Sequence, residues 1–133
     1  MAALARNPGS EACTLGVRVV VRPVYLPQQS RPSENQWVFA YRVRMVNESG
    51  RTVQLRTRHW TIVDADGERR SVDGEGVVGQ QPLLEPGGAF EYTSFCPLET
   101  AWGTMEGTFR FEAMDHAEPA EFDAVVARFY LVS

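Results

Sequence analysis

Apolar and polar side chains alternate along most of this 133-residue chain, and this alternation constrains the fold more than any other feature. In the clearest run, from Gln36 to Val46, the large apolar side chains share one parity: Trp37, Phe39, Tyr41, Val43 and Met45. Arg42 and Arg44 fall on the other parity. A period of two residues is typical of a strand with one buried face, and no window keeps an apolar stripe at the helical period of about 3.6 residues. The chain is therefore predicted to be all-β.

The same pattern predicts six further strands, most of them separated by turn residues. They are Leu15 to Tyr25, Thr52 to Val63, Glu68 to Val72, a strand with Phe90 and Tyr92, one from Met105 to Phe111, and Phe122 to Leu131. Asp66-Gly67 is a strong hairpin signal. The turn from Asn47 to Gly50 is expected to join its two strands as a hairpin loop does.

One of these strands contains a change of parity. Leu55 and Trp60 cannot face the same side of an uninterrupted strand, although both are typical core residues. A one-residue bulge near Arg58 and His59 brings both into the core, and we predict a bulge there.

The number and spacing of the strands predict a fold class and a domain boundary. About seven to eight short antiparallel strands favour a two-sheet sandwich of the immunoglobulin or fibronectin type III kind. Residues 1–14 are expected to form a flexible N-terminal tail, and residues 15–133 a single domain with an adequate core. The segment from Gly74 to Gly88 holds five glycines and two prolines and is expected to be irregular.

Composition excludes several partners and chemistries. The net charge is −4, so neither nucleic acid nor an anionic membrane is an expected partner. All 13 basic residues are arginine, which excludes a Schiff-base or P-loop lysine. Cys13 and Cys96 lie far apart and indicate no disulfide framework. Without an apolar segment long enough for a signal peptide or a membrane span, the expected location is the cytoplasm.

Four ordered blocks in the chain resemble a known family. They are RHWTIVD from Arg58, VDGEGVVGQQPLLEPG from Val72, FEYTSFCPL from Phe90 and WGTMEGTF from Trp102. Together they resemble the ApaG family over about Leu15 to Leu131, with Phe95 in place of a small residue and Phe109 in place of the commoner tyrosine. The resemblance implies a fibronectin type III-like sandwich. It also implies a gene neighbourhood with diadenosine tetraphosphate hydrolysis, a link to cobalt and magnesium tolerance, and, from similar modules in F-box proteins, protein binding.

The glycines Gly74, Gly76 and Gly79 match the dinucleotide-binding pattern GxGxxG. That pattern requires a helix whose N-terminus meets the pyrophosphate, and Pro82 and Pro86 leave no room for one. We favour a glycine-rich connection with positive φ angles. The alternative is a shallow nest of backbone amides that binds pyrophosphate without a helix.

No other motif supports a metal or catalytic site. Asp64-x-Asp66-Gly67 begins like a calcium loop but lacks the remaining ligands, so it reads as a turn. His59 and His116 are too dispersed for zinc, and His59 is expected to pack beside Trp60. Ser94 lacks a glycine-flanked elbow, and Cys96 precedes a proline in a turn-like segment. We assign no catalytic residue and no cofactor, and we predict that the chain is not an enzyme.

Arginines form the last candidate feature. Six of them occupy outward positions of consecutive strands: Arg18, Arg22, Arg42, Arg44, Arg56 and Arg58. They form either a basic stripe on one sheet or cross-strand pairs with acids such as Glu106 and Glu112. We favour the pairs. As residues with which to probe an interaction surface we select Arg44, Arg58 and Trp60.

Two hypotheses for function follow. The first is a non-enzymatic interaction module that binds a protein or peptide partner through a sheet edge or through the Gly74 to Gly88 loop. The alternative is an accessory protein that binds a nucleotide, pyrophosphate or divalent cation. Assembly into a homo-oligomer stays open at this stage.

Overall fold

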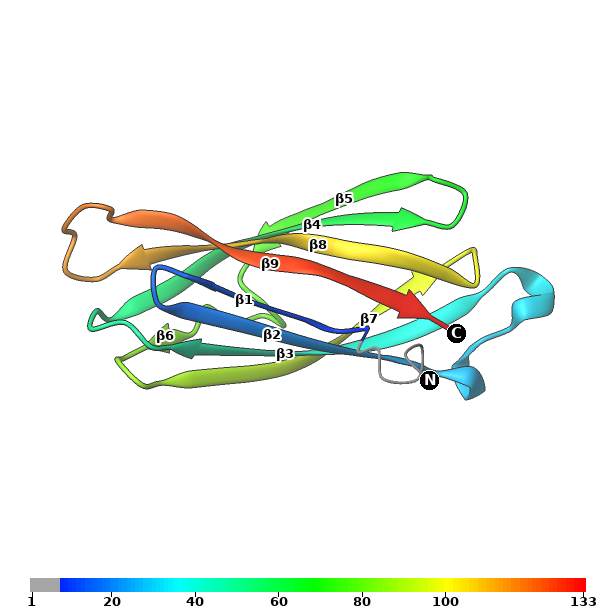
Figure 1. The fold of residues 1–133 in the computed structure, drawn as a ribbon, viewed down its shortest axis with the longest axis horizontal. Helices are drawn as coiled ribbons and strands as arrows, with labels where there is room; N and C mark the ends of the chain where they lie inside the picture. Colours follow the sequence, from blue (N-terminus) through cyan, green and yellow to red (C-terminus); the bar gives the residue numbers. More distant parts are fainter. Residues whose placement is uncertain (1–7) are drawn as a thin grey trace, which may run out of the picture.

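Residues 8–133, the part of the chain that the computed structural model describes, form two antiparallel sheets packed face to face (Figure 1). The sheet here called the β3 sheet has the order β1 (Ser10–Thr14), β2 (Val17–Tyr25), β3 (Trp37–Asn47) and β7 (Ala89–Leu98). The other, the β4 sheet, has the order β5 (Arg69–Glu75), β4 (Val53–Asp64), β8 (Trp102–Ala113) and β9 (Glu121–Val132), with β6 (Leu83–Leu84) paired to β4. The predicted all-β sandwich is confirmed, with nine strands in the described part.

The predicted faces of the strands are those that the structure buries. In β3 the side chains of Phe39, Val43 and Met45 are fully buried, while Arg42 and Arg44 are exposed. Two single-turn 3₁₀ helices, η2 (Pro27–Gln29) and η3 (Pro32–Glu34), lie in the polar loop after β2. No helix within residues 8–133 is long and apolar enough to cross a membrane.

The prediction of a flexible tail through residue 14 is wrong for its last part. Residues Ser10–Thr14 form β1, which pairs with β2 so that Ser10 lies opposite Val21. Leu15 and Gly16, with φ of 48° and 85°, make the turn between the two strands. The segment is too short and too polar to show alternation, and its strand comes from pairing with β2. The remainder of the predicted tail, residues 1–7, lies outside the described residues.

The turn after β3 is not a hairpin loop. Strand β3 pairs with β2 and β7, whereas β4 pairs with β5, β6 and β8, so the turn crosses from one sheet to the other. The side chain of Asn47 is fully buried in this crossing. Its Nδ2 donates to the carbonyls of Arg51 at 2.6 Å and Leu84 at 2.9 Å, and its Oδ1 accepts from the amide of Ser49 at 3.0 Å. A buried amide that satisfies three backbone groups stabilises the crossing.

The bulge in β4 lies two residues before its predicted place. The register of β4 against β8 shifts between Leu55 and Thr57, not near Arg58 and His59. Periodicity shows that the parity reverses before Trp60, but it does not show where the extra residue sits. The outcome for the core is as predicted, because Leu55 and Trp60 are both buried.

Two other segments also differ from the prediction. In the segment from Gly74 to Gly88, the first two residues belong to β5, and Leu83–Leu84 form β6. Cys96 lies within β7 and not in a turn, although Pro97 follows it. Proline is tolerated there because β7 is the last strand of its sheet, so the missing N–H need not face a neighbouring strand.

Candidate functional site

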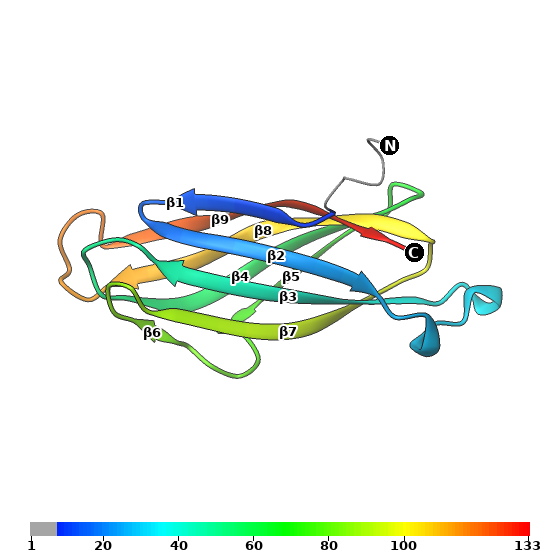
Figure 2. The ribbon, with the colours of Figure 1, turned by 60° about the horizontal axis from the view of Figure 1, so that its bottom comes forward.

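The two long sides of the sandwich differ. On one side β1 contacts β9, where Ser10 Oγ donates to the carbonyl of Ala127 at 2.6 Å and the amide of Val125 donates to Thr14 Oγ1 at 3.0 Å. On the other side β5 and β7 are the last strands of their sheets. Strand β5 is seen at the edge of the β4 sheet in Figure 1, and β7 at the edge of the β3 sheet in Figure 2. Edge strands present unpaired backbone N–H and C=O groups that can pair with another chain. We call this second side the open side and take it as the candidate functional site.

The free backbone groups of β5 follow from its hydrogen bonds to β4. The amide of Gly76 donates to the carbonyl of Arg56 at 2.8 Å, and the carbonyl of Glu68 accepts from the amide of Asp64 at 3.0 Å. In an antiparallel pair the residues that bond to the neighbour alternate along the strand. The groups that bond to β4 are therefore those of even-numbered residues. Those directed away from the sheet belong to Arg69, Ser71, Asp73 and Glu75.

The edge of β7 follows from the same reasoning. The amide of Asn47 donates to the carbonyl of Gly88 at 2.9 Å, so the even-numbered residues of β7 bond to β3. The N–H and C=O groups of Ala89, Glu91, Thr93 and Phe95 are directed away from the sheet. Pro97, the next in this series, has no N–H to donate. The usable edge of β7 therefore ends at Phe95, whose side chain is 58% exposed.

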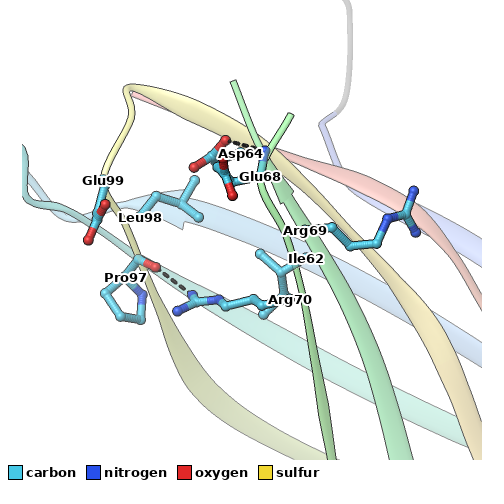
Figure 3. A pocket seen from close by; sticks show the side chains of 8 residues that line it. All are labelled: Ile62, Asp64, Glu68, Arg69, Arg70, Pro97, Leu98 and Glu99. Atoms are coloured by element: carbon cyan, nitrogen blue, oxygen red, sulfur yellow. Dashed lines mark hydrogen bonds between the residues drawn. The ribbon is translucent and has the colours of Figure 1, made fainter. Parts of the chain in front are cut away.

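Arg70 joins the two edges across the open side. Its Nη2 donates to the carbonyl of Pro97 at 2.6 Å (Figure 3). The same Nη2 lies 3.4 Å from Cys96 Sγ. Beside this contact is a hollow of about 470 Å³, lined by Ile62, Pro97 and Leu98 and by charged side chains. The open side is thus bridged at one end. Further along, β7 keeps its free groups, and β5 keeps all of its own except the carbonyl of Glu75, which accepts from Arg58 Nη1 at 2.9 Å.

Cys96 is not poised as a nucleophile. Burial raises the pKa of its thiol, and the nearby Arg70 offsets this only in part. Because the thiolate is the reactive form, a raised pKa keeps this cysteine inert at neutral pH. Cys13, the other free cysteine, is exposed in β1.

His59 does not pack beside Trp60 as predicted, because neighbouring residues of a strand face opposite sides. Its imidazole lies on the outer face of the β4 sheet, where Nδ1 is 2.5 Å from Asp73 Oδ1. The two line a shallow hollow of about 630 Å³ with Thr57, Thr108 and the Arg110–Asp123 ion pair, among others. The sequence contained a signal for this pairing, since a three-residue loop at Ala65 to Gly67 sets position 59 opposite position 73.

Two predicted sites, Arg58 and the glycine cluster, meet in space. The guanidinium of Arg58 lies against Gly74, where a Cβ would come within 2.7 Å of it. Its Nη1 donates to the carbonyls of Glu75 and Gly76, each at 2.9 Å. Arg58 therefore holds the start of the glycine-rich loop and does not present its charge as a free surface.

Gly76 and Gly79 have φ of 62° and 77°, as a glycine-rich connection predicts. The amide of Gly76 donates to Arg56, and the amides of Val77 and Gln80 donate to each other's carbonyl, at 2.8 Å in every case. Three amides of the loop are thus engaged within the protein. Binding of pyrophosphate at this loop stays a prediction without a contact to support it.

The arginines do not form one stripe. Arg56 and Arg58 lie on the β4 sheet and the other four on the β3 sheet, because β3 and β4 do not pair. Most of them have acidic partners within 3.0 Å: Arg18 with Glu11 and Glu48, Arg42 and Arg44 with Glu91, and Arg56 with Glu112. The paired arrangement that we favoured is the one present, although Glu106 pairs with Arg128 instead.

Of the three residues selected to probe a surface, Trp60 is the wrong choice. Its side chain is 2% exposed and lies in the core, because the bulge at Arg56 turns it inward. Arg44 is exposed and paired with Glu91 at 2.9 Å. Phe95 is exposed but was not selected from the sequence. The available signal was its size, because the family resemblance places a small residue at this position.

Metal-ligating side chains do not gather in groups of three or more within residues 8–133. The carboxylate of Asp64 instead accepts from the amides of Asp66 at 2.9 Å and Glu68 at 3.0 Å, which is the predicted turn. His116 Nδ1 lies 3.9 Å from Glu112 in an exposed pair.

Comparison with known proteins relates most of the chain to one family. The model of the ApaG domain matches residues 27–113. A protein named ApaG from Anaeromyxobacter dehalogenans is 51% identical over 92% of this chain and 94% of its own length. Another from Paramagnetospirillum magneticum is 50% identical over 90% of both chains. A crystal structure of a Bordetella pertussis protein that carries the name ApaA superimposes with a TM-score of 0.83, at 44% identity over 95% of each chain. None of these names states a reaction.

Proposed function

The chain belongs to the ApaG domain family, and we propose that it is a non-enzymatic interaction module that binds an extended segment of a partner protein along the edge of β7. The observation that carries this proposal is the edge from Ala89 to Phe95, which pairs with no other strand within residues 8–133 and ends in an exposed phenylalanine. Strand addition to such an edge draws its affinity from main-chain hydrogen bonds and its specificity from the side chains beside them.

The chemistry of the segment follows from the row of side chains that it would extend. Val24, Ala40 and Phe95 lie opposite one another across β2, β3 and β7 on the outer face of the β3 sheet. Val24 is 56% exposed and Phe95 is 58% exposed. An added strand continues this row with one more side chain, and an apolar residue there buries both its own surface and the ring of Phe95. The expected partner is an extended segment with an apolar residue opposite Phe95.

A proline substitution offers a test that leaves the sheet intact. The N–H of Thr93 is directed away from β3, so Thr93→Pro removes an edge donor and no hydrogen bond of the ladder. The matched control is Ser71→Pro, which does the same at the edge of β5. Selection of displayed heptapeptides against the wild-type protein is expected to yield binders that Thr93→Pro loses, that Phe95→Ala weakens roughly fivefold or more, and that Ser71→Pro retains. Failure to select any peptide, or binders indifferent to Thr93→Pro, would refute the proposal.

A further inference from the structure

The free edge of β5 carries a charge pattern that is complementary to itself. Its outward-facing backbone groups belong to Arg69, Ser71, Asp73 and Glu75, with a cation at one end and anions at the other. In an antiparallel pair of two such strands, the basic end of each lies against the acidic end of the other. We propose that two copies of this chain associate through their β5 edges, about a twofold axis at Val72. This inference concerns a different edge from the proposed function and does not depend on it.

With Val72 opposite itself, each of the four outward-facing residues of β5 has a partner in the second copy. Arg69 lies opposite Glu75 of the second copy, and Ser71 lies opposite Asp73. Both pairs occur twice because of the symmetry. All four residues direct their backbone groups to the edge, so these are the pairs that exchange N–H···O bonds. The carbonyl of Glu75 already accepts from Arg58 Nη1 and uses its second lone pair for the added strand. Val72 then falls at a pair without hydrogen bonds, where side chains approach more closely.

The side chains at the two ends of β5 have no competing ion pair. Within residues 8–133, no ion pair involves Arg69 or the carboxylate of Glu75. Val72 is 38% exposed although Trp60, its partner in β4, is buried in the core. A second copy of β5 therefore gives partners to two unpaired charges and covers an apolar side chain.

Other registers are less favourable. Moving the axis by one residue toward the C-terminus places Asp73 opposite Asp73, and like charges directly opposite destabilise a sheet. Moving it by one residue toward the N-terminus pairs Arg69 with Asp73 but leaves Glu75 beyond the end of the second strand. The charges therefore select one register as well as one orientation.

The same charges admit another reading, since charged residues on an edge strand commonly prevent pairing with other chains. The two readings differ in a measurable outcome. An edge protected by its charges gives a monomer, whereas complementary charges give a dimer that weakens in salt. Seven residues from each copy form a small interface, so the expected dissociation constant is on the order of micromolar.

Sedimentation velocity over increasing protein concentration tests the proposal. The wild-type chain is expected to pass from monomer to dimer. Ser71→Pro removes an edge donor of β5 without disturbing β4, and it is expected to abolish the dimer. Thr93→Pro at β7 serves as the control and is expected to leave it unchanged. A wild-type chain that stays monomeric, or a dimer that persists in Ser71→Pro, would overturn the proposal without bearing on peptide binding at β7.

Charge reversal tests the register independently of proline. Arg69→Glu makes both ends of β5 acidic, and Glu75→Arg makes both ends basic. Each variant alone is expected to raise the dissociation constant roughly tenfold or more, because like charges then lie opposite each other. An equimolar mixture of the two is expected to form a heterodimer at least as strong as the wild-type dimer. If the mixture associates no better than either variant alone, the register is wrong.

Discussion

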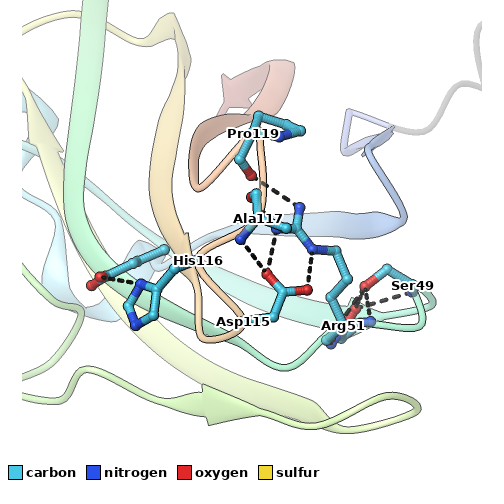
Figure 4. A network of polar contacts seen from close by, with 8 residues as sticks. Ser49, Arg51, Asp115, His116, Ala117 and Pro119 are labelled. Atoms are coloured by element: carbon cyan, nitrogen blue, oxygen red, sulfur yellow. Dashed lines mark hydrogen bonds and ion pairs between the residues drawn. The ribbon is translucent and has the colours of Figure 1, made fainter.

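The guanidinium of Arg51 donates to both carboxylate oxygens of Asp115, Nη2 to Oδ1 at 2.6 Å and Nε to Oδ2 at 3.0 Å (Figure 4). The same guanidinium donates to the carbonyls of Ala117 and Pro119. One arginine in the crossing between β3 and β4 thus holds the loop between β8 and β9 in place. Bidentate pairs of this kind are stronger than single hydrogen bonds between neutral groups.

The pair predicts a specific acid sensitivity. The hydrogen bond from Arg51, followed by that from the amide of Ala117, lowers the pKa of Asp115 from 3.8 to about 2. A carboxyl group with a lowered folded-state pKa stabilises the protein above its unfolded pKa, and this contribution is lost as the pH falls toward the folded pKa. Wild type is therefore expected to be more stable than Asp115→Asn above about pH 4, with a difference that narrows toward about pH 2.

Urea unfolding of both proteins across this pH range measures the difference. Glu48 and Glu91 also have lowered pKa values because of arginine hydrogen bonds, so both proteins will lose stability in acid. The comparison with Asp115→Asn isolates the contribution of Asp115. A difference that stays constant down to about pH 2 would contradict the assignment.

Aromatic packing around Trp60 predicts a large contrast between two phenylalanines. The Trp60 ring has its centroid 5.9 Å from Phe129 and 5.6 Å from both Tyr41 and Phe109, mostly edge to face. Phe129→Ala opens a cavity in this cluster and is expected to cost about 3 to 5 kcal/mol of unfolding free energy. The exposed Phe95→Ala is expected to cost about 0.5 kcal/mol or less. Chemical denaturation measures both, and comparable losses would be inconsistent with the burial of Phe129.

Two glycines of the glycine-rich loop allow the cost of a positive φ to be distinguished from the cost of a steric clash. Gly76 and Gly79 both have positive φ. A Cβ on Gly76 would lie 2.2 Å from the carbonyl oxygen of Gln80, whereas a Cβ on Gly79 would have no described atom within 4 Å apart from those of its chain neighbours. Gly79→Ala is expected to cost about 1 kcal/mol from its backbone conformation alone. Gly76→Ala is expected to cost about 2 kcal/mol or more because the loop must also shift. Equal losses in thermal or chemical unfolding would rule out the clash at Gly76.

Removal of the hydroxyl group is expected to have different effects on the unfolding free energy at two buried tyrosines, Tyr92 and Tyr41. The Tyr92 hydroxyl is buried and has no hydrogen-bond partner in the described part of the chain, and burial raises its pKa. Tyr41 is also buried but hydrogen-bonds Ser94. Tyr92→Phe is expected to leave the unfolding free energy unchanged or raise it by up to about 1 kcal/mol, and Tyr41→Phe to lower it by about 1 kcal/mol. Destabilisation by Tyr92→Phe would reveal a partner for its hydroxyl.

Alternation along the chain was enough to predict seven of the nine described strands and their buried faces. The alternation around Phe39, Val43 and Met45 identifies the inner face of β3 because each strand must bury one face, and this requirement is local. The Asp66-Gly67 turn likewise gave the β4–β5 hairpin, since a hairpin needs only residues near the turn. Four blocks of residues were enough to identify the family.

Which strands lie side by side depends on contacts between distant parts of the chain. Alternation shows that a face is buried, but it does not show which strand is the neighbour, so β3 and β4 were expected to pair although Asn47 leads the chain into the other sheet. The strand at Ser10–Thr14 depends on β2 and β9, and the place of the bulge depends on β8. The open side has the same origin, because an edge is a property of the whole sheet: within residues 8–133 no further strand pairs with the outer edges of β5 and β7.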